Sequence, residues 1–167
     1  KAPLAGGATN AGDKAEELGL PGITNAVEDV IVARDILISK ETGAQLHLCH
    51  CSTADSALLV GMAKDQGLRV TAEVCPHHFT MSDQEITEDD GRFKMNPPLR
   101  SPKDVQALKD ALASGVMDVI STDHAPHGAQ EKAQSMKKAP FGIVGLETSF
   151  ALGFTELVQG GYLSLAQ

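Results

Sequence analysis

The chain contains few aromatic residues and no long apolar run. Of its 167 residues none is Trp, one is Tyr and five are Phe. The core must therefore be aliphatic, which suits a buried parallel sheet better than an aromatic-rich sandwich. No apolar stretch reaches the roughly 18 residues that a membrane span requires, and no basic segment leads into an apolar core as in a secretory signal.

Cysteine and basic residues are also scarce. The three cysteines, Cys49, Cys51 and Cys75, are odd in number and two are almost adjacent, so reduced thiols and a cytoplasmic protein are expected. The 14 Lys and Arg residues are outnumbered by 22 Asp and Glu, which gives a net charge of −8. An acidic surface disfavours nucleic acid and anionic membranes as partners, and favours a small-molecule substrate.

Apolar periodicity alternates between short runs and longer helical stretches. It predicts strands over residues 46–51, 68–74 and 117–121, and helices over residues 26–42, 54–66 and 102–114. In the first helix, Ala26, Val30, Ala33 and Leu37 are predicted to form the inward face, and residues 82–92 are predicted to be an exposed connection. Alternating strands and helices are typical of parallel α/β folds. Because a (β/α)8 barrel needs about 250 residues, the chain could form about half of one.

Polar residues collect where the predicted strands end. His50, Glu73 and Asp123 each lie at the carboxyl end of a strand, the edge at which parallel α/β proteins build their sites. Strand alternation places His50 on one face and His47, Cys49 and Cys51 on the other. Not all four side chains are therefore expected to bind one ion.

Each of these residues also has a structural interpretation. His50 could be a hydrogen-bonded structural residue, and Asp123 could cap a helix. The functional interpretation makes Asp123 a metal ligand and a general base, because a carboxylate next to a zinc-held water can accept the proton of that water.

A competing metal site would use the cysteines. The candidates for a structural zinc knot are Cys49, Cys51, Cys75, His77 and His78. Structural zinc sites usually contain Cys-x2-4-Cys loops, and this Cys-x-Cys spacing does not match them. Small packing residues are the favoured interpretation of the thiols.

Two further segments could orient a substrate. Asn96 and Arg100 flank a rigid Pro97-Pro98 pair, and Phe141-Gly142 begins a glycine-punctuated stretch in which backbone amides could approach a ligand. Either segment could equally be a stiff approach to a helix.

In order and spacing, these segments resemble the dihydroorotases of the amidohydrolase superfamily, in the long-chain bacterial class. The resemblance extends over nearly the whole chain, and its matching stretches are residues 47–53, 71–78, 94–100, 121–127 and 139–148. It implies the C-terminal half of a metal-dependent amidohydrolase (β/α)8 barrel, with residues 1–167 forming the C-terminal portion of a single barrel domain and the N-terminal strands absent.

The resemblance also implies roles for individual residues. His50 and Asp123 would bind Zn²⁺, Asp123 would carry the proton as the catalytic residue, and the substrate would be bound by Asn96, His127, Phe141 and Gly142. His77 and His78 belong to the family pattern but receive no ligand role. The remaining ligands of the binuclear zinc centre would lie upstream, so we expect the chain alone to bind zinc weakly and to be inactive.

The implied reaction is the reversible hydrolysis of dihydroorotate to N-carbamoyl-L-aspartate in pyrimidine synthesis, in an enzyme that could be a homodimer. Two alternatives stay open at this stage. The first is a hydantoinase or allantoinase, which shares the barrel and its ligands. The second is an inactive barrel remnant that serves as a scaffold.

Overall fold

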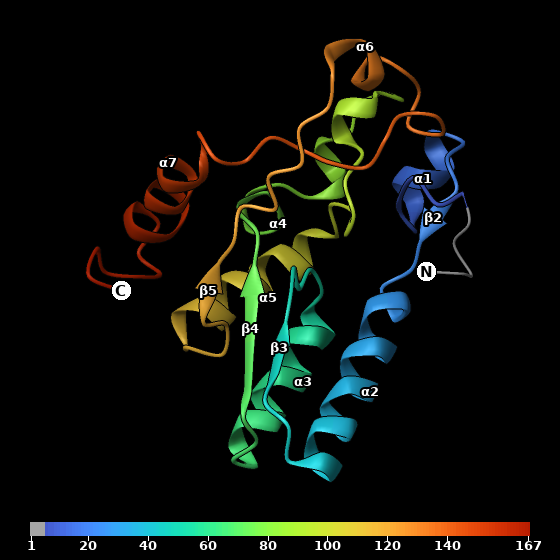
Figure 1. Ribbon diagram of the computed structural model, residues 1–167. Helices are drawn as coiled ribbons and strands as arrows, with labels where there is room; N and C mark the ends of the chain where they lie inside the picture. Colours follow the sequence, from blue (N-terminus) through green and yellow to red (C-terminus); the bar gives the residue numbers. More distant parts are fainter. Residues whose placement is uncertain (1–5) are drawn as a thin grey trace.

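Three short parallel strands form the centre of the computed structural model, which describes residues 6–167 (Figure 1). They are β3 (Leu46–Leu48), β4 (Val70–Val74) and β5 (Val119–Ile120), in the spatial order β3-β4-β5. Leu46 pairs with Val70 and Glu73 pairs with Val119. Because neighbouring parallel strands share their direction, the segments that follow all three strands emerge at one edge.

Three helices provide the crossovers. They are α2 (Ala26–Thr42), α3 (Ala54–Asp65) and α5 (Pro102–Ala113), and Figure 1 shows them together beside the strands. Local chemistry sets their ends: Thr53 accepts a hydrogen bond from the Ser56 amide, and Ser101 forms a capping box with Asp104. Gly43 ends α2 in the left-handed conformation that glycine adopts most easily.

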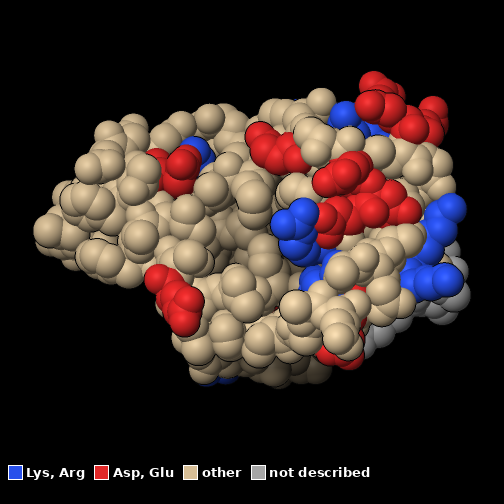
Figure 2. Space-filling model, turned by 90° about the horizontal axis from the view of Figure 1, so that it is seen from above, with Lys and Arg blue, Asp and Glu red and all other residues tan. Residues whose placement is uncertain are grey.

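Shorter elements complete the fold around this unit. They are β1 (Thr9–Asn10), α1 (Asp13–Glu17), β2 (Gly22–Ile23), α4 (Pro76–Thr80), α6 (Ala129–Lys132) and α7 (Ser149–Gly153), with 3-10 turns at Asp83–Glu85 and Gly91–Phe93 and a π-helical stretch at Phe154–Gln159. No helix within residues 6–167 combines the length and apolarity needed to cross a bilayer. From above, the end of the molecule that contains α7 is nearly free of charged side chains, which gather towards the opposite end (Figure 2).

Two aliphatic cores hold the elements together. Val60, Val74 and Leu108 are fully buried in the core between the strands and helices. Ile86 and Met136 are fully buried in a second core under the connecting segments. Burial of each of these aliphatic side chains contributes roughly 1.5–3 kcal/mol to stability. The expected mixed α/β fold with parallel strands is confirmed.

The predicted inward face of α2 is wrong. Val30 and Leu37 are each 64% exposed, whereas Val32, Ile36 and Ser39 are buried. Because α2 carries apolar residues around most of its circumference, periodicity could not select the face that packs against α3 and β3.

The segment of residues 82–92 is only partly the exposed connection that its polarity predicts. Most of its residues are exposed, among them Gln84, Glu88 and Arg92. Ser82, Asp83 and Ile86 are buried. The Asp83 carboxylate accepts a hydrogen bond of 2.8 Å from Asn10, and the Asp83 amide donates to the Arg100 carbonyl. A polar segment can be buried when partners satisfy its polar groups.

Candidate metal and substrate site

Two of the predicted site residues converge from different strands. His50 lies two residues after β3, and Asp123 lies three residues after β5. The distance between His50 Nε2 and Asp123 Oδ1 is 3.7 Å, and both side chains are partly open to solvent. These two atoms are therefore close enough for both to contact one ion.

The backbone at both residues is unusual. Among the described residues, His50 (φ 56°) and Asp123 (φ 44°) are the non-glycine residues with positive φ. For residues with a Cβ atom this left-handed conformation costs of order 1–3 kcal/mol and tends to persist at functional sites. The strain thus falls on the two residues that converge.

Glu73 connects His50 to a second histidine. Its Oε1 lies 2.7 Å from His50 Nδ1, and its Oε2 lies 3.2 Å from His47 Nε2. The other ring nitrogen of His47 lies 2.8 Å from the Thr71 hydroxyl. The sequence analysis noted Glu73 at a strand end but gave it no role. Its position could have indicated one, because β4 lies between the two strands that precede His50 and Asp123.

The Glu73 carboxylate lies beside the His50 ring, in a close ion-pair contact with Nδ1. The hydrogen-bond partner of Nδ1 is the Cys75 thiol, at 3.5 Å. The other ring nitrogen of His50, Nε2, faces Asp123. Carboxylate–histidine pairs of this kind orient metal-binding imidazoles. We call His50, Glu73 and Asp123 the His50 centre.

This arrangement corrects the prediction that His47 and His50 lie on opposite faces. Both rings contact the Glu73 carboxylate, because the positive φ of His50 breaks the alternation after Leu48. Cys51, predicted to share the face of His47, is instead buried in the core between the strands and helices. Alternation fails here because β3 ends at Leu48.

Asn96 shares a pocket with His50, but Arg100 is used internally. His47, His50 and Asn96 line a pocket of about 430 Å³. Arg100 also borders it, yet its guanidinium donates to Ser52 Oγ (3.1 Å), Asn10 Oδ1 (3.1 Å) and the Ile23 carbonyl (2.9 Å). Arg100 therefore ties loops together, and its predicted part in orienting a ring is not supported by these contacts.

The remaining predicted residues form a second group. His127 Nε2 lies 2.9 Å from the Phe141 carbonyl, to which it donates as N–H. Gly142 has φ 148°, and a Cβ there would meet the Ala125 carbonyl at 2.4 Å and the His127 ring at 2.9 Å. His127 and Gly142 line a pocket of about 330 Å³. Glycine is required here because other protein groups approach its backbone.

A lysine that sequence reasoning missed holds this loop. Lys132 Nζ donates to the carbonyls of Lys94 (2.9 Å), Pro140 (3.1 Å) and Gly142 (2.7 Å). The Lys94 ammonium in turn lies 4.4 Å from the centroid of the Phe141 ring. Burial lowers the pKa of both lysines. Lys132 lies in a polar segment, and its sequence context gives no sign of this role.

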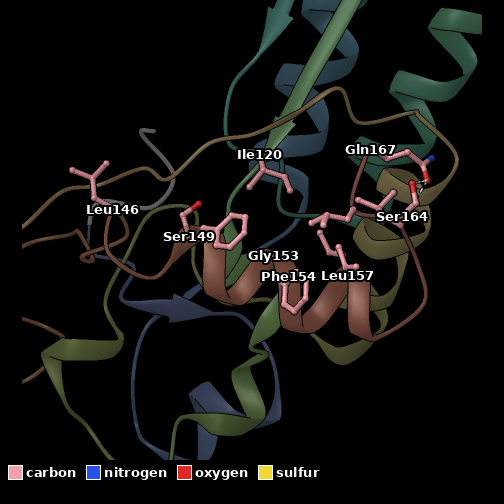
Figure 3. Close-up of a pocket in the computed structure, with 12 residues that line it drawn as sticks. Ile120, Leu146, Ser149, Gly153, Phe154, Leu157, Ser164 and Gln167 are labelled. Atoms are coloured by element: carbon pink, nitrogen blue, oxygen red, sulfur yellow. Dashed lines mark hydrogen bonds between the residues drawn. The ribbon is translucent and has the colours of Figure 1, made fainter.

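Another pocket lies away from these groups. The apolar pocket between β5 and α7, of about 430 Å³, is lined by Ile120, Phe150, Phe154, Leu157 and neighbouring apolar or uncharged residues (Figure 3). Its lining contains no acid, base or thiol, so it offers no group for proton transfer or metal binding.

Comparisons with known proteins agree with this geometry. No protein-family model matches the chain. It is 51% identical over 162 residues to a dihydroorotase of Staphylococcus epidermidis and 51% identical over 164 residues to a dihydroorotase of Enterococcus faecalis. The chain is therefore a homologue of the dihydroorotases. The matches cover 97% and 98% of the chain but 38% of each relative, so the chain spans well under half the length of these relatives.

Solved structures of related hydrolases share the fold. The crystal structure of dihydropyrimidinase from Brevibacillus agri matches 97% of the chain and 36% of its own length, with a TM-score of 0.80 and 25% identity. L-hydantoinase (dihydropyrimidinase) from Arthrobacter aurescens matches 83% of the chain and 31% of its own length, with a TM-score of 0.77 and 30% identity. The chain thus has the fold of part of an amidohydrolase barrel.

Proposed function

We propose that this chain provides part of the active site of a dihydroorotase. The enzyme would hydrolyse the cyclic amide of dihydroorotate reversibly to N-carbamoyl-L-aspartate, in the cytoplasmic synthesis of pyrimidines. The observation that carries the proposal is the convergence of His50 and Asp123, both with positive φ, at 3.7 Å. The chain would form one portion of a single barrel domain, in an enzyme that could be a homodimer.

His50 and Asp123 would hold zinc in this enzyme. Their donor atoms fit the ion, because an imidazole nitrogen and a carboxylate oxygen are common zinc ligands and the Glu73 carboxylate lies beside the His50 ring. When bound, zinc polarises the amide carbonyl and lowers the pKa of a water molecule to about 7. The further ligands of a binuclear centre would come from outside this chain.

Asp123 would move the proton. Its carboxylate accepts a proton from the attacking water and delivers it to the ring nitrogen as the C–N bond breaks. In the synthetic direction the same oxygen takes the proton from the carbamoyl nitrogen, and water leaves. Glu73 would not contact the substrate and would act as a positioning residue through His50.

The substrate would lie between the two groups of predicted residues. Asn96 offers an amide donor and acceptor to the polar ring, from the pocket that it shares with His50. The Nε2–H group of His127 is already committed to Phe141, so Nδ1 can donate to a carboxylate only when the ring is protonated. Phe141 and Gly142 would supply the adjoining backbone.

The hydantoinases are the second candidate function. They are favoured by the solved structures, which are 25–30% identical to the chain in the two cases above. The dihydroorotases are about twice as similar in sequence, at 51%. We therefore propose dihydroorotate rather than hydantoin as the preferred substrate, and an active enzyme rather than a scaffold.

The test uses a protein of full dihydroorotase length that contains this sequence. We expect it to hydrolyse dihydroorotate with a kcat/KM at least about 100-fold above that for hydantoin or dihydrouracil, because a site that hydrogen-bonds a polar group of its substrate discriminates strongly against analogues that lack this group. Asp123→Asn should reduce kcat at least about 100-fold, because it removes both a ligand and the proton carrier.

The matched control is Asp110→Asn, on the exposed side of α5, which should leave kcat unchanged. Preferred turnover of hydantoin would transfer the assignment to the hydantoinases. Full activity in Asp123→Asn would refute the proposed catalytic role. A folded protein that neither binds zinc nor turns over any cyclic amide would support the scaffold alternative.

A further inference from the structure

Beside the His50 centre lies a second cluster of metal-ligating side chains that the proposed reaction does not use. Cys75, His77 and His78 each offer one ligand atom, and these atoms lie within 4.8 Å of one another. All three residues are buried; His77 is 4% and His78 2% exposed. They come from the end of β4 and the first turn of α4. We call this cluster the His77 pocket.

Each histidine of the His77 pocket has one ring nitrogen without a hydrogen-bond partner among the described residues. His78 Nε2 lies 2.9 Å from the Pro97 carbonyl, so this nitrogen must carry the hydrogen, and Nδ1 then holds a lone pair. Within residues 6–167, His78 Nδ1 and His77 Nε2 are buried without a hydrogen-bond partner. Buried polar atoms in native proteins nearly always have a partner, which can be protein, water or a metal ion.

Both rings are neutral in this environment. Burial lowers the pKa of His77 to about 3, with a smaller contribution from His78, and lowers the pKa of His78 to about 4. Neutral imidazole is the form that binds metals. Burial also raises the pKa of the Cys75 thiol, helped by the charges of Asp123 and Glu73, so this sulfur stays protonated unless a cation replaces the proton.

The ligand set selects the class of ion. Structural zinc sites almost always have four protein ligands, and no fourth His, Cys, Asp or Glu of the described residues joins this group. A thiolate and two neutral imidazoles carry one negative charge, so a monovalent cation gives a neutral site. A divalent cation would leave a net charge in a buried position, which is costly. Thiolate ligands favour soft ions, Cu(I) among them.

We propose that Cys75, His77 and His78 form a three-coordinate binding site for a soft monovalent cation, Cu(I). Binding exchanges one proton for the cation: Cys75 releases its S–H proton to solvent as the Cu–S bond forms, and no electron is transferred. The two unpartnered nitrogens become ligands. This site does not depend on the proposed hydrolase activity.

The two clusters meet at one atom. Cys75 Sγ lies 3.5 Å from His50 Nδ1, and Cys75 also belongs to a second potential metal group with His50 and Asp123. Copper bound in the His77 pocket would therefore alter the surroundings of the His50 ring directly. Occupancy should be visible in the NMR signals of His50 as well as in those of the two ligating histidines.

The experiment titrates the full chain with Cu(I) under anaerobic, reducing conditions, in competition with a chromophoric Cu(I) chelator. We expect one tightly bound Cu(I) per chain, with one sulfur and two nitrogen neighbours in the X-ray absorption spectrum. Cys75→Ser, which is nearly isosteric, should weaken the affinity at least about 100-fold. Circular dichroism of the variant confirms that it is folded.

Cys49→Ser is the matched control, because Cys49 is an exposed thiol in a different group, with His47 and Glu73. It should change the affinity for Cu(I) less than about 3-fold, a change worth less than 1 kcal/mol. Loss of binding in Cys49→Ser but not in Cys75→Ser would overturn the proposal. So would unchanged ¹⁵N shifts of His77 and His78 on titration, which would leave a buried water as the partner of these rings.

Discussion

The His50 centre and the His77 pocket share a border but differ in exposure and charge. The His50 side chain is 32% exposed and lies between the carboxylates of Glu73 and Asp123. His77 and His78 are 4% and 2% exposed, and the hydrogen bond that the structure gives them goes to a backbone carbonyl. A histidine ring thus lies beside negative charges at the first site and is buried away from solvent at the second.

The difference shows how surroundings decide what a histidine can bind. Carboxylates beside an open imidazole supply negative charge for a divalent cation and leave room for water and substrate. A closed site with one thiol can balance a single positive charge and excludes water. We therefore expect hydrolytic chemistry at the first site and only metal binding at the second.

Of the three changes that test this comparison, Glu73→Gln is expected to have the largest effect, because it removes the carboxylate that distinguishes the His50 centre. The amide has no negative charge, so the close contacts that the carboxylate makes with the His47 and His50 rings weaken. Such orienting partners are typically worth 10–100-fold in metal affinity, and we expect about that loss of zinc affinity in the full-length protein.

A second measurement separates positioning from folding. In the metal-free chain, the ¹⁵N shifts of the His50 ring should change, because the negative charge beside Nδ1 is removed. Glu41→Gln, on the exposed surface of α2, is the control and should change neither zinc affinity nor the shifts. Unchanged ¹⁵N shifts of His50 in Glu73→Gln would show that the carboxylate does not position the ring.

The sequence alone predicted the places of the three strands, although the first strand ends at Leu48 and not at residue 51. His50 and Asp123 follow short β-rich runs, and parallel strands with helical crossovers must bring such positions to one edge. The helices that begin at Ala54 and Pro102 are predictable, because Thr53 and Ser101 are residues that cap helices well and Leu108 and Leu112 recur at helical spacing. Local rules determine these features, so the sequence suffices.

Long-range contacts account for what could not be predicted. The positive φ of His50 turns its ring towards Glu73, which the His47 ring also contacts. Strand alternation had instead placed His50 on the face opposite to His47. The three carbonyls that bind Lys132 come together only in the folded chain. The cysteine spacing argued against a zinc knot; the structure separates Cys49 and Cys51 from the His77 pocket and keeps Cys75 in it.

A pH titration tests the second half of the comparison. The folded-state pKa of His77 is lowered from 6.5 to about 3 by burial and by the neighbouring His78 and His50. As the pH falls below about 6.5, the unfolded chain therefore binds a proton at His77 that the folded chain does not bind. The stability that His77 contributes is complete above that pH and is lost as the pH falls, by about 2 kcal/mol at pH 5.

Urea unfolding of the metal-free chain at pH 7 and pH 5 measures this loss. His77→Gln should reduce the difference in unfolding free energy between the two pH values by about 2 kcal/mol, because glutamine does not titrate. Carboxylates contribute little in this range, since their ordinary pKa values lie near 4. An equal pH dependence in both proteins would mean that His77 is accessible to protons, and the contrast with the His50 centre would fail.

The smallest effect is expected at the start of α5, which contacts α3 and α4. Ser101→Ala removes the capping box with Asp104 and should lower the unfolding free energy by about 1 kcal/mol, with an unchanged denaturant m-value. Ser149→Ala, at the first residue of α7, where no side-chain cap bond forms, should change it much less. Because Ser101 contributes no ligand, both variants should retain their affinity for Cu(I). A loss of copper binding in Ser101→Ala would mean that the His77 pocket depends on global stability rather than on its three ligands.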